Sequence, residues 1–324
     1  MEAYELQNAD VAVQIYERRY ADGYMDEWPV EKKRRISALI KDLPLPEKGR
    51  ALDFGCGNGI FTNVIKEALP GWEVYGCDIS SVAIGNALDR YPQCKFFLLD
   101  ALGMESLSFD FIFSHHVFEH VHNLENTIEE MDALARPQCC MLHVLPCGNP
   151  GSLAHTISKL RKDGINSDKG DRYFFEDPGH LRRVKTDQLE NLFQVHKYRL
   201  HGEKYSNQLH GEIEYMTSLS REFILSLTDE AQAMDKNSAR ELRRIRKKLL
   251  LIYNLRYFAM FVRDRIGKNN RTLRQYMALA CGLCFWGLSY PFDLYFRSRA
   301  SLEWKRSSNQ RNGGEMYLSF LRVV

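Results

Sequence analysis

The sequence predicts an α/β fold in which helices cover both faces of a doubly wound, mainly parallel sheet. Apolar, strand-like runs alternate with helical patterns from about residue 50 to residue 146, as consecutive βαβ units require. Acidic residues close three successive runs, at Asp53, Asp78 and Asp100. Open α/β sheets bind ligands at the carboxyl ends of their strands. We therefore expect a binding site where these three acids meet.

A glycine-rich loop follows the first predicted strand. Residues 51–59 read Ala-Leu-Asp-Phe-Gly-Cys-Gly-Asn-Gly, with glycine at positions 55, 57 and 59. Glycine lets the backbone turn sharply and approach a ligand, and the Asp53 carboxylate can accept hydrogen bonds. In the dinucleotide-binding fingerprint the third glycine comes one residue later, where a helix N-terminus receives a pyrophosphate. The G-x-G-x-G spacing therefore predicts a ligand without a pyrophosphate.

The rest of a nucleotide-binding unit follows in order. Apolar residues recur at helical spacing over 60–69, and Pro70-Gly71 ends that helix. A second strand over 72–79 reaches Asp78, which lies 19 residues beyond Gly59, about the distance at which a carboxylate binds ribose hydroxyls. A third strand is expected over 95–101. The alternative is that Asp78 and Asp100 are ordinary loop residues at strand ends.

Two motifs resemble class I S-adenosylmethionine-dependent methyltransferases. The glycine loop, with Asp53 two residues ahead of it, resembles their cofactor loop. The strand 109–114 and the segment 115–121, Phe-Asp-Phe-Ile-Phe-Ser and His-His-Val-Phe-Glu-His-Val, are similar to the "F-D-x-I … V-L-E-H-V" signature of one subfamily. That subfamily includes the ubiquinone-type O-methyltransferases and many glycan and small-metabolite enzymes.

The resemblance implies a Rossmann-like sheet of seven strands with an antiparallel last strand. It predicts a helix over 127–136, a turn at Pro137-Gln138-Cys139 in place of the family's Pro-Gly-Gly, and a fifth strand through residue 146. A helix over 186–193 follows, with Thr186 as its N-cap. The sixth and seventh strands are expected at 195–204 and 313–321, paired at the sheet edge.

About ninety residues separate the last two strands, which predicts an insertion. We divide the chain into a methyltransferase domain (1–208), a basic and apolar helical insertion (209–300) and a segment that completes the sheet (301–324).

The family resemblance also implies the cofactor, S-adenosylmethionine, and most of the residues around it. Asp53 would face the amino acid end of the cofactor, Asp78 the ribose, and Asp100 the adenine. Tyr20 belongs to a segment similar to the family's N-terminal lid helix; a tyrosine stripe that only packs is the alternative. The expected cofactor-binding residues are Asp53, Gly55, Cys56, Gly57, Gly59, Asp78, Ile79, Asp100, Ala101, Ser114 and Tyr20.

Histidine is the natural general base for removing a proton from the methyl acceptor near neutral pH. His115, His116, His120 and His180 are the candidates, and we predict catalytic roles for His180 first, then His116 and His120. His116, Glu119 and His120 share one face if the segment is helical. In ubiquinone-type enzymes the matching positions bind a divalent metal through carboxylates, whereas the first of them is histidine here. Glu119 and His120 could instead orient the loop.

We predict no metal ion. Cys281-x-x-Cys284 has metal-binding spacing, but it lies in an apolar run without a second ligand pair, and a structural zinc needs four ligands.

The predicted insertion is strongly basic in one part and uncharged in the next. Residues 236–274 hold 13 Lys and Arg against 2 acids, whereas residues 275–292 carry no charge. A basic amphipathic helix beside an uncharged aromatic one can lie on an anionic membrane surface. A solvated basic face over the active site is the alternative. A span is less favoured, because it would place the last strand across the bilayer from its sheet.

The expected reaction is O-methylation of a small-molecule, lipid-linked or glycan acceptor. The partners would be a small or amphiphilic acceptor and, through 236–292, an anionic membrane; nucleic acid is not expected. Two alternatives remain, an RNA methyltransferase that uses the basic insertion and an S-adenosylmethionine-binding protein that does not methylate. No N-terminal apolar stretch precedes Glu17-Arg18-Arg19, so we expect a cytoplasmic protein, peripheral at the membrane if the insertion docks there.

Overall fold

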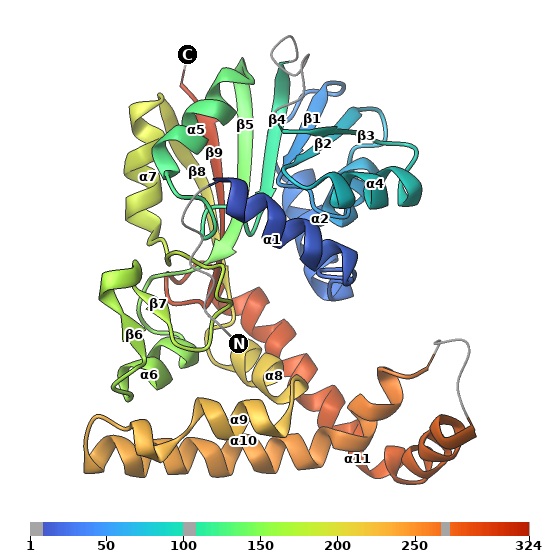
Figure 1. Cartoon of the computed structure of the whole chain (residues 1–324), viewed down its shortest axis with the longest axis vertical. Coiled ribbons are helices and arrows are strands. Elements are labelled where there is room, and N and C mark those ends of the chain that lie inside the picture. The colour runs from blue at the N-terminus through green and yellow to red at the C-terminus, as the bar shows by residue number, and fades with distance from the viewer. Residues whose placement is uncertain (1–8, 100–107, 267–272, 324) are drawn as a thin grey trace. The chain divides into compact units, whose positions relative to one another are not determined.

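The computed structural model of the protein describes residues 9–99, 108–266 and 273–323 (Figure 1). The chain forms two compact units. The first comprises Met1–Cys147, Asp177–Glu203 and Met316–Val324, and the second comprises Gly148–Glu176 and Lys204–Glu315. The chain thus leaves the first unit twice and returns to it twice.

A seven-stranded sheet has the order β3-β2-β1-β4-β5-β9-β8. Its strands are β1 (Arg50–Phe54), β2 (Glu73–Asp78), β3 (Lys95–Leu98), β4 (Phe109–His115), β5 (Ala135–Pro146), β8 (Tyr198–Ser206) and β9 (Glu315–Arg322). The first five pair in parallel. Backbone bonds from Val323 to Lys197 and from Gly314 to Ser206 show that β9 runs antiparallel to β8. The predicted sheet with an antiparallel last strand is confirmed.

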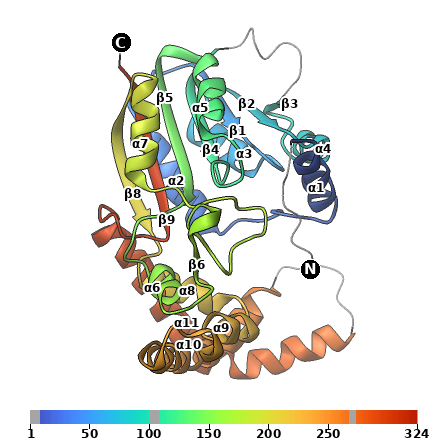
Figure 2. The ribbon, with the colours of Figure 1, turned by 60° about the vertical axis from the view of Figure 1, so that its left-hand side comes forward.

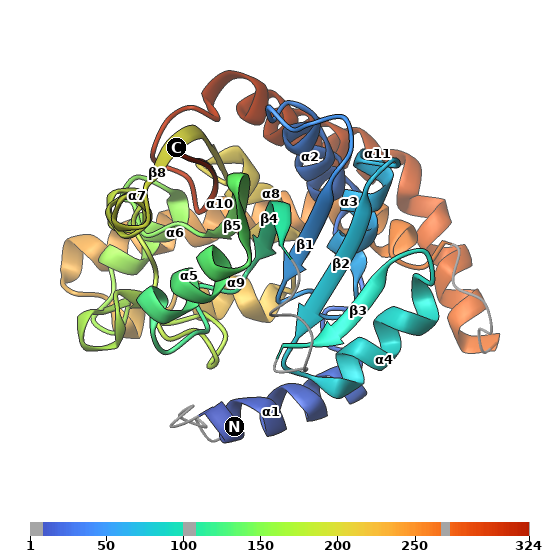
Figure 3. The same ribbon diagram turned by 90° about the horizontal axis from the view of Figure 1, so that it is seen from above.

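Helices cover this sheet on both faces (Figures 2 and 3). Those of the first unit are α1 (Ala9–Ala21), α2 (Val30–Lys41), α3 (Ile60–Ala68), α4 (Ser81–Arg90), α5 (Leu124–Ala133) and α7 (Thr186–Val195). From β1 the chain moves through α3 to β2, and from β4 through α5 to β5, in opposite directions along the sheet. Right-handed crossovers therefore place α3 and α5 on opposite faces.

The centre of the sheet is a continuous apolar core. Phe109, Phe111, Ile112 and Phe113 of β4 are completely buried, which is the pattern of a parallel strand covered on both faces. This rigid centre holds the carboxyl ends of β1, β2 and β4 at one edge, where the predicted site residues lie.

Two local predictions are wrong. The helix before β5 ends at Ala133, and residues 137–139 belong to β5 instead of a turn. The β4–β5 pairing shifts from Phe109↔Ala135 to Phe111↔Cys140, so the intervening residues form a bulge. Thr186 is the first residue of α7 and not its N-cap, because the helix already begins there and Lys185 precedes it as the cap.

The second unit is mainly helical. Its elements are α6 (Leu153–Lys159), the short strands β6 (Ile165–Asn166) and β7 (Arg172–Tyr173), α8 (His210–Ser218), α9 (Arg221–Leu227), α10 (Lys236–Arg263) and α11 (Leu273–Ser307). Ile157 and Tyr173 share an apolar cluster with Ile213 and Leu242. The unit therefore contains more of the chain than the predicted insertion, namely residues 148–176, 204–208 and 301–315.

Candidate active site

Asp78 is fixed at the end of β2 by backbone N–H groups. Its two carboxylate oxygens accept hydrogen bonds from the Gly57 N–H at 2.8 Å and the Ser80 N–H at 3.0 Å. Burial raises the pKa of Asp78, and the backbone donors oppose that rise because they stabilise the charged form. The result is a buried acceptor group held in place at the edge of the sheet.

The glycine loop adopts a backbone that other residues rarely adopt. Gly55, Gly57 and Gly59 have φ angles of 75°, 50° and 79°. A Cβ atom on Gly55 would lie 2.5 Å from a methyl group of Val117, and one on Gly57 would lie 2.8 Å from the Tyr20 hydroxyl. The loop therefore needs glycine both for its conformation and for the space above it. A Cβ atom on Gly59 would lie 3.0 Å from atoms of Ala87, Phe96 and Tyr91, so this glycine allows close packing instead.

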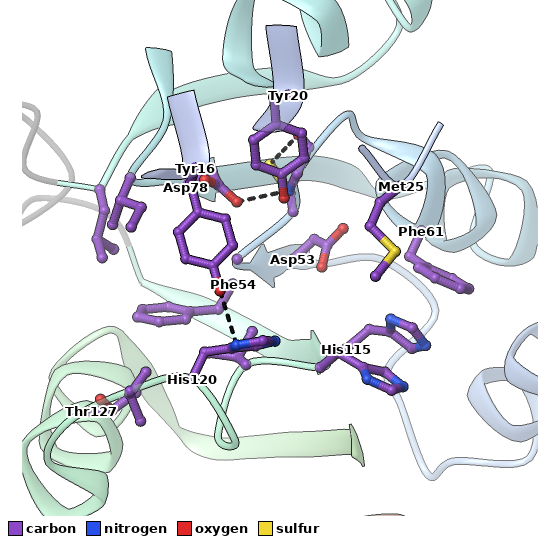
Figure 4. Close-up of a pocket in the computed structure, with 18 of the residues that line it drawn as sticks. Tyr16, Tyr20, Met25, Asp53, Phe54, Phe61, Asp78, His115, His120 and Thr127 are labelled. Carbon is purple, nitrogen blue, oxygen red and sulfur yellow. Dashed lines mark hydrogen bonds between the residues drawn. The ribbon is translucent and has the colours of Figure 1, made fainter. Parts of the chain in front are cut away.

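A cavity of about 480 Å³ opens over these strand ends (Figure 4). Asp53, Gly55, Cys56, Gly57, Asp78 and Ile79 line its floor, and Tyr20 lies over them. Seven of the predicted cofactor-binding residues therefore come together. Gly59 and Ser114 are not among the lining residues; Ser114 is buried and bonds to His143 at 2.8 Å. Asp100 and Ala101 lie outside the described residues.

Asp53 is the more protected of the two floor carboxylates. It is 1% exposed and accepts a hydrogen bond from the Thr62 hydroxyl at 2.7 Å. Burial, together with the neighbouring charge of Asp78, raises the pKa of Asp53 to about 7. A positively charged ligand group would reverse this effect, because an opposite charge favours the ionised carboxylate.

Three tyrosines from α1 and the turn after it form the roof. The rings of Tyr16 and Tyr20 lie 6.3 Å apart, and those of Tyr20 and Tyr24 lie 5.7 Å apart. Arg19 stacks over Tyr24 at 4.1 Å and forms an ion pair with Asp177. Burial raises the pKa of Tyr16 and Tyr20, so both phenols stay protonated and can donate hydrogen bonds.

His116 carries the most organised imidazole beside the cavity. Its Nδ1 lies 2.7 Å from a carboxylate oxygen of Glu119, which is 1% exposed. Burial alone would raise the pKa of Glu119, but His116 and the two other histidines nearby lower it to about 2. Neither carboxylate oxygen has a hydrogen-bond partner among the described residues, so the contact with His116 is an ion pair. An ionised carboxylate thus holds the imidazole ring beside the cavity.

His115 and His120 also line the cavity, whereas His180 is not among the lining residues. The Nδ1 atom of His120 lies 2.9 Å from the Tyr16 hydroxyl and 3.0 Å from the Gly179 carbonyl. Burial lowers the pKa of His120 to about 4, so it is neutral at pH 7. His180 lies behind it, edge to face, with ring centres 4.7 Å apart.

A possible metal-binding donor set also lies here. Ligand atoms of His116, Glu119 and His180 are all within 4.8 Å of one another. Two imidazoles and one carboxylate suit a divalent transition metal better than Mg²⁺. The carboxylate is already paired with His116, which is consistent with a metal-free arrangement, and the absence of a metal stays a prediction.

Several residues that line this cavity were not predicted from the sequence, among them Tyr16, Tyr24, Met25 and Trp28. Tyr16 and Tyr24 lie four residues before and after the predicted Tyr20, and this spacing was the sequence signal that could have identified them. Trp28 lies between two helices, and nothing in its sequence context distinguishes it from a packing residue.

The profile of a family described as a methyltransferase domain matches residues 28–201, which is more than half of the chain. The chain belongs to this methyltransferase family. The match confirms the prediction that the protein is a class I S-adenosylmethionine-dependent methyltransferase, and with it the predicted cofactor.

Curated relatives of this methyltransferase match only part of it. A trans-aconitate 2-methyltransferase of Variovorax paradoxus is 30% identical over 122 residues, covering 37% of this chain and 44% of the relative. A malonyl-[acyl-carrier protein] O-methyltransferase of Enterobacter lignolyticus is 27% identical over 111 residues, covering 33% and 42%. The matches thus span less than half the length of these relatives.

One solved structure is a Haemonchus contortus phosphoethanolamine N-methyltransferase 2 in complex with S-adenosyl-L-methionine. The alignment covers 100% of this chain and 60% of the Haemonchus chain. The TM-score is 0.47 and the sequence identity 13%, so nothing about activity follows from it.

Proposed function

We propose that the protein transfers the methyl group of S-adenosylmethionine to an oxygen atom of a small or amphiphilic acceptor. The observation that carries this proposal is that the glycine loop, Asp53, Asp78 and four histidines line one cavity. Groups suited to hold the cofactor therefore lie beside groups suited to deprotonate an acceptor, as a transferase with two substrates requires.

The floor and roof of the cavity fit the cofactor. Asp78 offers buried carboxylate oxygens for ribose hydroxyls, and Gly55 and Gly57 leave space that a Cβ atom would fill. Asp53 would face the positively charged amino acid end, and Tyr20 would cover the ligand. When bound, the cofactor supplies a methyl group activated by its sulfonium, so the protein needs to align the acceptor and remove its proton.

We assign the role of general base to His116, with Glu119 as its positioning residue. His116 lines the cavity and its ring is held by an ionised, buried carboxylate, which is how a histidine base is oriented in a catalytic triad. Proton transfer from the acceptor to Nε2 leaves an imidazolium that Glu119 stabilises. His180, the first choice from the sequence, is less suited because it lies behind His120.

The acceptor class rests on the relatives' names and on the cavity. Both relatives are methyltransferases, and one is named as an O-methyltransferase of an acyl-carrier-protein-bound acid. The aromatic roof suits an acceptor that carries an apolar portion. We place the reaction in the cytoplasm, with lipid-linked and glycan acceptors as further candidates.

Calorimetry with S-adenosylmethionine tests the cofactor site. Asp78→Ala and Gly57→Val should each weaken binding by at least tenfold, or about 1.4 kcal/mol, the scale of a lost hydrogen bond to a charged group. Asp89→Ala, an exposed acid on α4, is the matched control and should bind as the wild type does. Asp78→Asn keeps the shape of the side chain in case Gly57→Val misfolds. Unchanged affinity in all variants would refute the proposed site.

A product screen with labelled cofactor then identifies the acceptor. Carboxylic acids, quinols, lipid-linked glycans and tRNA should be compared, and we expect labelled ester or ether products. Label in tRNA alone would favour the RNA alternative. Cofactor binding with no labelled product from any class would favour a protein that binds the cofactor without methylating.

A further inference from the structure

The first half of α11 exposes apolar side chains almost all round. Residues 275–292 contain no charged residue, yet Met277 is 64% exposed and Leu288 is 74% exposed. Among the described residues, one helix, Met277–Ser307, is long and apolar enough to cross a membrane by length and composition, and only 22% of its most apolar window is buried. A water-soluble helix normally buries such a face.

The polarity of this helix is inverted. The side that packs on α10 carries Ser289, whose hydroxyl donates to the Leu255 carbonyl at 2.7 Å, and Asp293, which is 3% exposed and pairs with Arg256 at 2.9 Å. The outward positions Met277, Leu288 and Tyr295 recur at spacings of eleven and seven residues and so share one stripe. Its polar groups face protein and its apolar groups face outward, as expected of a helix with an apolar surrounding.

The neighbouring helix α10 supplies positive charge on its exposed surface. Part of its charge is used internally: Arg243 and Arg246 pair with Glu230, and Arg256 and Arg263 pair with Asp293. Arg240, Arg244 and Lys247 are exposed at spacings of four and three residues, in line with Leu251, which is 61% exposed; Arg244 also lies 3.8 Å from the Glu241 carboxylate on the surface. α11 packs on the C-terminal half of α10, through Leu255 and Arg256, so these cations lie further along the same helix and are not beside the apolar stripe. An anionic membrane surface complements a helix pair that exposes both cations and apolar side chains.

We propose that the outward stripe of α11 inserts into the interfacial layer of an anionic membrane while Arg240, Arg244 and Lys247 of α10 contact the lipid headgroups. This membrane association does not depend on the proposed methyl transfer. The helices lie in the surface and do not span it, because Asp293 and the arginines that bind it would otherwise sit within the hydrocarbon. The pairing of β9 with β8 also requires both ends of the insertion to stay on one side.

Sedimentation of the full chain with vesicles tests the proposal. Binding should be weak on phosphatidylcholine, strong on equal parts phosphatidylcholine and phosphatidylglycerol, and reduced by salt. Substituting Arg240, Arg244 and Lys247 together with Gln should weaken binding by about a hundredfold, since each base near an anionic surface contributes roughly fivefold. The same change at the exposed Lys41, Lys48 and Lys162 is the matched control and should leave binding unchanged. Arg243 is left intact because it already pairs with Glu230.

The native cysteines report which face is covered. Of the eight cysteines, Cys281 and Cys284 on α11 are exposed and the other six are buried. Both thiols should react with a maleimide in buffer and become protected on anionic vesicles. Unchanged labelling of vesicle-bound protein, or no binding to any vesicle, would overturn the proposal. Slow maleimide labelling of both thiols in the absence of lipid, together with a dimer mass in light scattering, would also overturn the proposal. It would mean that a second copy of the chain covers the stripe.

Discussion

At the scale of single residues, His116 combines backbone strain with a buried partner. Its φ of 55° is unusual for a residue other than glycine, and such conformations persist only where the surrounding structure enforces them. The His116 N–H donates to the Val144 carbonyl at 2.8 Å, and Glu119 holds the ring. The strain is therefore localised at the residue to which we assign proton removal.

His116→Ala should lower kcat by about a hundredfold or more with little effect on cofactor affinity, because a positioned base contributes on that scale. Glu119→Gln should lower kcat less and shift the pH–rate profile, since the ring loses its charged partner. Steady-state rates with the acceptor from the product screen, measured with and without a chelator, check both. His180→Ala is the comparison and should retain most activity. A large loss in His180→Ala with a normal rate in His116→Ala would reverse the assignment, and a loss caused by the chelator would contradict the prediction of no metal.

Cofactor affinity should depend on pH through Asp53. Its pKa of about 7 in the free protein means that the carboxyl is protonated below neutral pH, and a cationic ligand group favours the ionised form. Binding should therefore strengthen as the pH rises from about 6 to about 8 and should release a proton. Calorimetry in two buffers of different ionisation enthalpy measures that proton. Asp53→Asn should remove the pH dependence; an unchanged profile in this variant would exclude Asp53 as its source.

The sequence identified most of the cavity floor because chemistry and spacing coincide there. Asp53, Gly57 and Asp78 lie at strand ends that a βαβ pattern brings together. The choice among histidines could not be made in the same way. His116 and His180 are far apart in the chain, and only the folded structure shows which ring reaches the cavity and which lies behind His120.

At the scale of elements, a buried ionic cluster joins α8, α10 and α11. Arg256 is completely buried and bonds to Asp293 of α11 and to Glu214 and Thr217 of α8. Arg263 pairs with the second oxygen of Asp293 at 2.8 Å. This cluster holds α11 at its middle, two residues beyond Pro291, where proline removes a backbone hydrogen bond.

Asp293→Ala should destabilise the second unit by about 3 to 5 kcal/mol, because it leaves the buried Arg256 without its main partner. Urea unfolding followed by hydrogen exchange in α10 and α11 measures the change. Asp264→Ala removes an exposed acid from the end of α10 and should cost less than about 1 kcal/mol. Equal effects of the two substitutions would show that the cluster contributes no special stability.

Element boundaries were predicted well where periodicity is strong and poorly where backbone pairing decides. The helix over 60–69 appears as Ile60–Ala68 because apolar spacing defines it. The turn at 137–139 became a bulge because Arg136 pairs with Asp110 of β4 at 2.9 Å and draws this segment into the sheet. A pairing between two distant residues has no local sequence signal.

At the scale of the whole molecule, the chain divides its charge between parts. Residues 236–274 carry a net charge of +11, and the rest of the chain carries −9, since 31 bases there face 40 acids. The near-neutral total of +2 therefore conceals two parts of the chain with net charges of opposite sign. Composition alone could indicate this division. The ion pairs that five of these arginines form within the described residues could not be seen without the structure.

Binding of the cofactor should stabilise the first unit only, because every residue that lines the cavity belongs to that unit. Saturating S-adenosylmethionine at about 100 times its Kd should stabilise that unit by about 2.7 kcal/mol. Hydrogen exchange mass spectrometry should show slower exchange in α1, in residues 53–59 and in residues 115–123, with α10 unchanged. Slower exchange of similar size in α10 would mean that ligand binding is coupled to the second unit.

The position of β9 has a consequence for synthesis. This strand lies between β5 and β8, yet it is the last described element to leave the ribosome. Until it arrives, β5 and β8 each present an unpaired edge, and such edges recruit other chains. The helices of the second unit are complete before that moment and can fold first, since domains generally fold in order of synthesis. We therefore expect ribosome-bound chains that lack β9 to be held by chaperones and to gain cofactor binding only after that strand is released.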